Sequence, residues 1–251
     1  MSKQRLDQHL VDIGRFPSRA RARDAILRGT VSLDGIVCTK PAQKIGQGVA
    51  ITVDDPASRF VSRAALKLVE GLRQFEVDPK GRTCLDIGAS TGGFTQLLLE
   101  HGAAKVHAID VGHDQLHESL RAHPQVHAQD GLNARDLTQE HLGGDRPELL
   151  VSDVSFISLK LALPPALSLA ATGAEGIFLV KPQFEAGKDK IGKGGLVDPQ
   201  IAENTAASLQ NWLATVPGWT AGALVPSPLK GGDGNAEWLL HGKKTGRPLP
   251  P

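Results

Sequence analysis

Short apolar segments alternate with helical segments from Thr83 onward, and this alternation constrains the fold more than any other feature of the chain. The segments that favour β-strands are Thr83–Ile87, Val106–Asp110, Leu149–Val154 and Ile177–Val180. Amphipathic segments that favour helices lie between them. This order predicts an α/β domain with a doubly wound, mostly parallel sheet. Because such sheets bind their ligands outside the carboxyl ends of the strands, we expect the functional residues at that edge.

A glycine-rich loop closes the first of these strands, in the run Leu85–Phe94 (LDIGASTGGF). Glycines let the backbone turn tightly and approach a ligand. The loop is neither a dinucleotide fingerprint, because Ser90 replaces its second glycine, nor a P-loop, because no Gly-Lys-Ser/Thr follows. A plain tight turn is the alternative interpretation.

Two acids at the ends of the following strands favour a nucleoside ligand over a plain turn. Asp110 ends the second strand, where an acid can bind ribose hydroxyls, and Asp130 ends the third, where a purine edge would lie. A nucleoside without a pyrophosphate, such as S-adenosylmethionine, fits this pattern best. The residues expected to bind it are Asp86, Gly88, Ala89, Ser90, Thr91, Gly92, Gly93, Phe94, Asp110 and Asp130.

The N-terminal part of the chain is basic. The whole chain has a net charge of +1, but residues 1–60 contain ten Lys or Arg residues against six Asp residues. We expect two helices there, the second running from Arg19 to about Arg28 behind an N-cap at Ser18 with Ala22, Ile26 and Leu27 facing inward, and then a hairpin that turns at Asp34-Gly35.

The arginines of the second helix are candidate RNA ligands. Arg19 and Arg23 lie four residues apart, so they share a face near the helix N-terminus, where free N–H groups also bind phosphate oxygens. A solvated helix face is the alternative, and the clustering of charge in so small a module favours RNA.

Four charged residues stand where strands or helices should bring them to the ligand-binding edge. Asp153 and Lys181 each follow an apolar strand, and Lys67 lies in a helix that leads into the domain. Glu237 opens a last strand, and it lies at the same edge if that strand is antiparallel. Each could be a surface charge, but together they place two lysines and two carboxylates beside the cofactor, where neighbouring charges tune one another.

The motifs together resemble the TlyA (hemolysin A) family of ribosomal RNA 2′-O-methyltransferases, within the FtsJ-like superfamily. The similarity covers roughly residues 4–244, and residues 4–51 resemble the small RNA-binding domain named after ribosomal small-subunit protein four. The motifs that carry it are Ser62-Arg63 with Lys67, the Leu85–Phe94 loop, Ser152–Ser158 (SDVSFIS), Lys181–Glu185 (KPQFE) and Gly234–Glu237 (GNAE).

The resemblance implies a Rossmann-like, S-adenosylmethionine-dependent methyltransferase with an antiparallel last strand, joined to a small α+β RNA-binding domain. It implies methylation of a ribose 2′-hydroxyl, in a cytidine of 16S or 23S ribosomal RNA, with ribosomal subunits as partners. The family's catalytic tetrad maps to Lys67, Asp153, Lys181 and Glu237. Lys181 is our candidate base because burial and the cation Lys67 would favour its neutral amine, whereas Asp153 would oppose this by favouring the charged form. Alternative functions are a non-catalytic ribosome-binding or assembly protein, or a methyltransferase for another RNA or a small molecule.

RNA contacts are expected on both domains. The loop of residues 188–195 is rich in lysine and glycine, and we predict either an ordinary surface loop or a lid that touches RNA phosphates. The residues expected to contact RNA are Arg5, Arg15, Arg19, Arg23, Arg63, Lys188 and Lys190.

Composition also indicates where the protein acts. The apolar runs are too short to span a bilayer, and the N-terminus has no apolar signal segment. Cys38 and Cys84 form no C-x-x-C pair, which favours a reducing compartment, so we expect a cytoplasmic protein. His113 and His117 have a spacing that can bind metal but no evident third ligand, so no metal is predicted. The expected domains are 1–55 (RNA-binding), 56–62 (linker), 63–244 (methyltransferase) and 245–251 (flexible tail).

Overall fold

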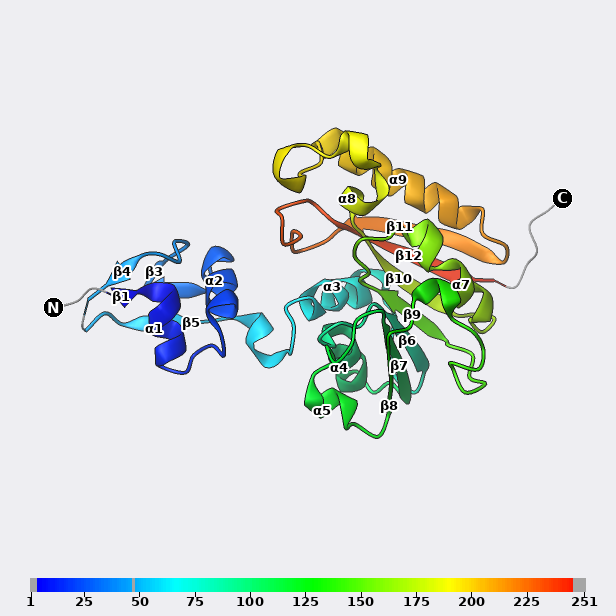
Figure 1. The fold of residues 1–251 in the computed structure, drawn as a ribbon, viewed down its shortest axis with the longest axis horizontal. Coiled ribbons are helices and arrows are strands. Elements are labelled where there is room, and N and C mark those ends of the chain that lie inside the picture. Colours follow the sequence, from blue (N-terminus) through cyan, green and yellow to red (C-terminus); the bar gives the residue numbers. More distant parts are fainter. Residues whose placement is uncertain (1–3, 47, 246–251) are drawn as a thin grey trace. The chain divides into compact units, whose positions relative to one another are not determined.

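The computed structural model describes residues 4–46 and 48–245 and consists of two compact units, Met1–Arg59 and Phe60–Pro251 (Figure 1). The predicted flexible tail, 245–251, lies outside the described residues except for Thr245. Each unit has its own hydrophobic core, so each is described by itself.

The first unit packs two helices against two small sheets. Strand β1 pairs with β4, and β2 lies between β3 and β5 in a three-stranded antiparallel sheet. The core is built from small and branched apolar side chains of both helices, with Phe16 closing it. The elements are β1 (Gln4–Arg5), α1 (Leu6–Asp12), α2 (Arg19–Leu27), β2 (Val31–Leu33), β3 (Ile36–Val37), β4 (Lys44–Ile45), β5 (Ile51–Val53) and a 3-10 turn (Pro56–Arg59).

In this unit the structure confirms the predicted N-cap and hairpin turn and contradicts one predicted core residue. The Ser18 hydroxyl accepts a hydrogen bond from the Arg21 amide at 3.3 Å, which confirms the predicted N-cap of α2. Asp34 and Gly35 both have positive φ (48° and 80°), as a type I′ hairpin turn requires. The prediction that Leu27 faces inward is wrong, because this side chain is 55% exposed at the end of α2.

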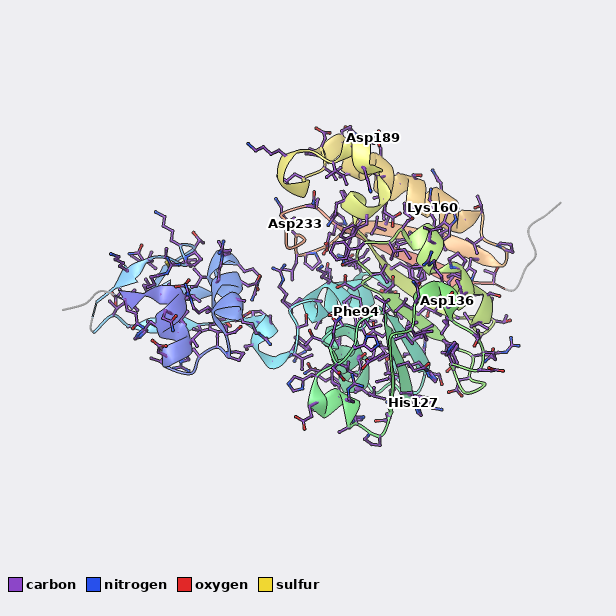
Figure 2. The ribbon with its side chains drawn as sticks, in the orientation of Figure 1. Phe94, His127, Asp136, Lys160, Asp189 and Asp233 are labelled. Atoms are coloured by element: carbon purple, nitrogen blue, oxygen red, sulfur yellow. The ribbon has the colours of Figure 1, made fainter. Side chains whose placement is uncertain are left out.

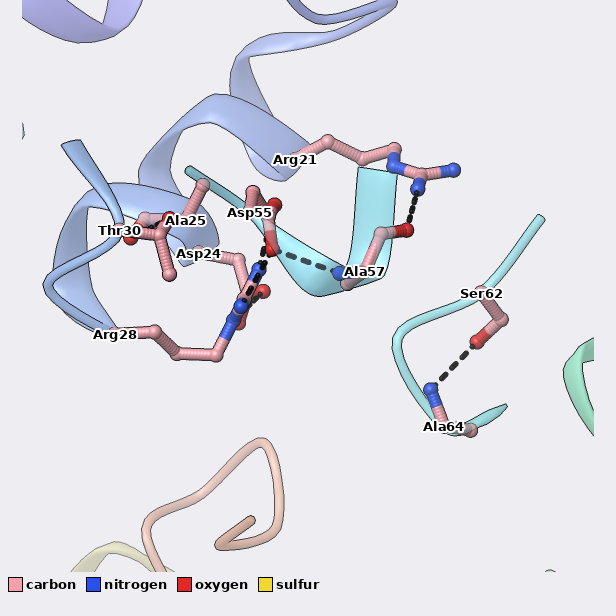
Figure 3. Close-up of polar contacts among 9 residues, drawn as sticks. All are labelled: Arg21, Asp24, Ala25, Arg28, Thr30, Asp55, Ala57, Ser62 and Ala64. Carbon is pink, nitrogen blue, oxygen red and sulfur yellow. Dashed lines mark hydrogen bonds and ion pairs between the residues drawn. The ribbon is translucent and has the colours of Figure 1, made fainter. Parts of the chain in front are cut away.

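The segment that follows β5 is anchored to α2 rather than extended (Figure 3). The Arg28 guanidinium donates to both oxygens of Asp55 at 2.8 and 2.9 Å and also to Asp24 at 2.8 Å. Arg21 donates to the Ala57 carbonyl at 3.1 Å. The polar residues around Asp55 are therefore held by helix α2 of the first unit.

The second unit is built on a seven-stranded sheet with the order β11-β12-β10-β9-β6-β7-β8. The five neighbouring strands β10, β9, β6, β7 and β8 are parallel to one another. Strand β12 runs antiparallel to β10, as predicted. The strands are β6 (Thr83–Ile87), β7 (Lys105–Asp110), β8 (Val126–Asp130), β9 (Leu149–Ser152), β10 (Glu175–Val180), β11 (Trp219–Pro226) and β12 (Trp238–Lys244).

Helices cover both faces of this sheet, because the central strands are apolar on both sides (Figure 1). Leu149 and Val151 face the core under α3 and α4, whereas Leu150 faces the core under α6, α7 and α9. The helices are α3 (Ala65–Phe75), α4 (Gly93–Glu100), α5 (Glu118–Arg121), α6 (Leu159–Ala162), α7 (Pro164–Leu169), α8 (Pro182–Glu185) and α9 (Pro199–Ala214). None of the helices within residues 4–46 and 48–245 combines the length and the apolar character that crossing a bilayer takes.

Candidate active site

The carboxyl ends of the parallel strands meet at one edge of the sheet, and the predicted functional residues gather there. Asp110 ends β7, Asp153 follows β9 and Lys181 follows β10. Val180 pairs with Trp238 at the end of the β10–β12 ladder. Lys181, which follows Val180, and Glu237, which precedes Trp238, therefore both lie just beyond this last pair. The antiparallel direction of β12 thus brings Glu237 to the edge formed by the ends of the other strands.

Two neighbouring cavities open at this edge, of about 1020 and 160 Å³, and they share Gly88, Ser90, Asp153 and Ser155. The larger one also contains Asp110, Asn133, Phe156 and Gln183 in its wall. Of the residues predicted to bind the cofactor, Gly92 and Asp130 line neither cavity, and the others line one or both. The glycine loop and the end of β7 therefore face the same open space.

The backbone of the glycine loop is turned toward Asp110. Ser90 has a φ of 46°, the left-handed conformation that glycine usually supplies, and its N–H donates to Asp110 Oδ2 at 2.8 Å. The other carboxylate oxygen accepts from the Gly112 amide at 2.7 Å. Gly88 has a φ of 82°, and a Cβ there would lie 3.0 Å from Val154. These contacts fix the Asp110 carboxylate at the cavity wall, and each oxygen keeps a lone pair that a ribose hydroxyl can use.

Asp130 is held away from the cavities. Its carboxylate accepts from the Asp114 amide at 3.1 Å and from the Arg121 guanidinium at 2.6 Å. The amide hydrogen bond, and then the guanidinium, hold the pKa of this carboxyl below its ordinary value. In this arrangement Asp130 ties the end of β8 to the loop after β7 and to α5.

Asp86 is fully buried beneath the glycine loop. Its Oδ2 accepts from the Thr95 hydroxyl at 2.7 Å, and no hydrogen-bond partner for Oδ1 lies among the described residues. Burial raises the pKa of Asp86 to about 7, and the nearby carboxylate of Asp153 adds to the rise. A carboxyl in such surroundings costs the fold stability when it ionises, which is typical of a residue kept for function.

Replacing this carboxyl should therefore change how stability depends on pH. Between the unfolded pKa near 4 and the folded value of about 7, the folded chain holds the proton longer, so the free energy of unfolding falls as pH rises. Relative to the wild type, the Asp86→Asn variant should gain in free energy of unfolding between pH 4.5, where the difference is below about 1 kcal/mol, and pH 8, where it reaches up to about 4 kcal/mol. Urea unfolding at both pH values measures this difference. An equal pH dependence in the two proteins would contradict the assignment.

The four tetrad residues form two ion pairs. Lys67 of α3 is buried, and its ammonium donates to Glu237 Oε2 at 2.6 Å, with both side chains at most 7% exposed. Gly231 allows a loop to pack on this carboxylate, since a Cβ there would lie 2.7 Å from Glu237 Oε1. This pair connects the first helix of the unit to its last strand.

The second pair stands in the wall of the smaller cavity. Lys181 Nζ lies 2.6 Å from Asp153 Oδ1 and donates a hydrogen bond to Ser155 Oγ at 2.8 Å. Asp153 lines both cavities, whereas Lys67 and Glu237 line neither. Lys181 and Asp153 can therefore contact a bound substrate directly. The buried Lys67–Glu237 pair does not line either cavity and can act only by stabilising the surrounding structure.

Two residues have no role assigned from the sequence: Phe156 in the wall of the larger cavity, and Glu185, which follows the cavity residue Phe184. Phe156 is 91% exposed with a φ of 65°, which is strained for a bulky side chain, and its ring lies 5.0 Å from that of Phe184. Glu185 accepts from Ser158 Oγ at 2.5 Å and from the Leu159 amide at 2.7 Å, and burial raises its pKa. It thus ties α8 to the start of α6, at the far end of the Phe156 loop. In the sequence, Phe156 and Glu185 were marked only by their positions in the SDVSFIS and KPQFE motifs.

The basic residues expected to bind RNA lie on both units. Arg15 and Arg23 are exposed, and Arg5 and Arg19 are half-exposed beside Asp7. The 188–195 loop forms two 3-10 turns, Lys188–Lys190 and Lys193–Gly195. The first turn contains Asp189, which is labelled in Figure 2. Lys188 lines the larger cavity. Within residues 4–46 and 48–245, no three His, Cys, Asp or Glu side chains cluster as a metal site would require.

Comparison with protein families agrees with this geometry. The family described as FtsJ-like methyltransferase matches residues 60–244, and the S4 domain family matches residues 4–51. The site described above lies wholly within the first match, and the basic helix α2 lies within the second.

Individual relatives extend over nearly the whole chain. The 16S/23S rRNA (cytidine-2′-O)-methyltransferase TlyA of Mycobacterium tuberculosis is 45% identical over 240 residues, 95% of this chain and 89% of the relative. Hemolysin A of Brachyspira hyodysenteriae is 38% identical, over 94% of this chain and 98% of the relative. A solved structure described as a hemolysin, from Streptococcus thermophilus, superposes with a TM-score of 0.76 at 36% identity, over 99% of this chain and 90% of that one.

Proposed function

The chain belongs to the TlyA family of FtsJ-like methyltransferases, and from this membership we propose that it transfers a methyl group from S-adenosylmethionine to the 2′-hydroxyl of a cytidine in 16S or 23S ribosomal RNA. The observation that carries the proposal is the Lys181–Asp153 pair at the wall of a cavity that also contains the glycine loop and Asp110. One ligand in this space can meet the cofactor-binding loop and the paired lysine together.

The larger cavity suits a nucleoside cofactor. Asp110 would hold the ribose hydroxyls, and the tight turns at Gly88 and Ser90 would admit the amino-acid portion close to the backbone. S-adenosylmethionine, when bound, supplies a methyl group activated by a positively charged sulfur. We assign Asp86 the role of stabilising the glycine loop, because its carboxyl group accepts a hydrogen bond from Thr95 of α4, the helix that follows this loop. Asp130 would act indirectly, through the loop that it ties to β8.

Lys181 is assigned the role of base for the 2′-hydroxyl, a weak nucleophile that needs positioning and loss of its proton. In this role Nζ would accept the proton of the hydroxyl, while Asp153 and Ser155 fix where Nζ stands. Lys67 and Glu237 would hold α3 against the start of β12 through their buried pair. The exposed ring of Phe156 offers an apolar surface beside the cavity on which the nucleobase can rest.

The first unit would hold the ribosomal RNA, with its arginines on the phosphate backbone. Such contacts position the enzyme, while the methyltransferase unit selects the ribose. Arg63, Lys188 and Lys190 would add contacts beside the site. A substrate of this kind places the protein with ribosomes in the cytoplasm.

Mapping of ribose methylation tests the proposed function. Ribosomal RNA from cells that contain the gene should carry 2′-O-methylcytidine at a defined position, and RNA from cells without it should lack the mark there. The purified protein with S-adenosylmethionine should restore the mark on subunits from the second strain. Identical maps in both strains, combined with no binding of the cofactor in calorimetry, would favour a non-catalytic ribosome-binding protein.

A further inference from the structure

A buried carboxylate joins two arginines on the surface of the first unit. The Asp7 side chain is only 3% exposed, whereas those of Arg5 and Arg19 are 48% and 55% exposed. Arg5 comes from β1 and Arg19 from the first turn of α2, so residues far apart in the chain meet at one acid. A buried aspartate flanked by half-exposed guanidiniums differs from an ordinary surface ion pair, in which both partners are solvated.

Both oxygens of Asp7 are fully used. Arg5 donates to Oδ1 through Nε at 3.0 Å and to Oδ2 through Nη2 at 2.8 Å. The Gln8 amide donates to Oδ1 at 2.9 Å, and Arg19 Nη2 donates to Oδ2 at 3.2 Å. The hydrogen bonds from Arg5, and then from Arg19, lower the pKa of Asp7 to about 2, so the acid stays charged under all physiological conditions.

The two guanidiniums keep donors for a ligand. Each has five N–H donors, and Asp7 engages two on Arg5 and one on Arg19. The two cations outnumber the single acid, so the cluster is positive. A free arginine loses much side-chain freedom when it binds an anion, and prior fixation by Asp7 removes part of that cost.

We propose that Asp7 is a positioning residue that holds Arg5 and Arg19 side by side as one binding site for a phosphate of the RNA backbone. The inference rests on the proposed function, because it takes ribosomal RNA as the ligand of the first unit. It assigns to an acid a role in binding a polyanion. By net charge alone, removal of Asp7 should strengthen RNA binding, whereas loss of positioning should weaken it. The two explanations therefore predict effects of opposite sign.

The test compares two variants of the full-length protein that remove the same charge from the same helix. Asp7→Asn disrupts the cluster, and Asp12→Asn is the matched control, because the described partners of Asp12 are the neutral side chains of Gln4 and Gln8. Binding to purified, unmethylated ribosomal subunits is measured over a range of KCl concentrations. Asp7→Asn should weaken binding about tenfold, the scale of one charge-assisted contact. It should also reduce the salt slope by about 1, whereas Asp12→Asn should bind as well as the wild type or more tightly.

A double-mutant cycle separates positioning from a folding defect. In the Arg5→Ala/Arg19→Ala background, adding Asp7→Asn should cause no further loss, because no guanidinium is left to position. A loss of the same size in that background shows that Asp7 acts only through folding and overturns the inference. Binding by Asp7→Asn that equals that of Asp12→Asn also overturns it. If Arg5→Ala/Arg19→Ala binds subunits like the wild type, the RNA-binding role proposed for these arginines fails as well, which the other two outcomes leave intact.

Discussion

Lys181→Ala is expected to lower the rate of methyl transfer to ribosomal RNA by a factor of about 10²–10⁴, the contribution that a positioned base makes. The affinity for S-adenosylmethionine should change little, because the glycine loop and Asp110 do not depend on this side chain for their hydrogen bonds. Single-turnover assays with unmethylated subunits measure the rate, and calorimetry measures cofactor binding.

Controls for this variant come from the same unit. Lys160→Ala removes an exposed lysine of α6 (Figure 2), the helix that follows the Phe156 loop, and should leave the rate unchanged. Lys181→Arg keeps the positive charge near Asp153 but supplies no basic amine, so it should be nearly as slow as Lys181→Ala. Turnover like the wild type in either Lys181 variant would exclude this residue as the base.

Glu237→Gln should produce the largest loss of stability, about 3–5 kcal/mol in the free energy of unfolding. The substitution leaves the Lys67 ammonium buried without its counter-charge, and a buried unpaired charge is among the most costly defects in a protein. Denaturant unfolding of the full-length protein, monitored on the transition of the second unit, measures the loss.

Two further variants distinguish the buried pair from ion pairs in general. Glu70→Gln breaks the more exposed pair with Arg73 on the same helix α3, and it should cost far less stability because both partners are screened by solvent. Lys67→Met combined with Glu237→Gln removes both charges and should regain most of the stability while methyl transfer remains impaired. If Glu237→Gln were as stable as Glu70→Gln, the pair would contribute little to the fold.

The sheet was predictable because its strands are apolar on both faces and end in charged residues. Alternation alone indicated the doubly wound order, and Asp110, Asp153 and Lys181 could be placed at one edge because parallel strands end together. The composition of the tetrad came from the resemblance to a family. Its division into two pairs required the structure, because nothing in a sequence states which lysine meets which carboxylate.

Other features depended on contacts between distant residues and could not be predicted. Asp55 is paired with Arg28, the C-cap residue of α2, and nothing in the sequence indicates that these two residues meet. Asp130 was predicted as a cofactor ligand from its position at the end of β8, and its pairing with Arg121, which the sequence did not indicate, is seen only in the structure. The sequence did not predict that Phe156 is exposed, because a hydrophobic side chain usually indicates burial. Its exposure is seen only in the structure.

The Lys67–Glu237 pair also has a consequence for biosynthesis, since its two members are 170 residues apart in the chain. A chain emerging from the ribosome releases Lys67 170 residues before Glu237, so this pair cannot close until the start of β12 has been made. Premature termination before β12 would leave the lysine without its carboxylate and β10 without its antiparallel neighbour. The Lys67–Glu237 pair therefore makes folding of the second unit depend on synthesis of its last strand.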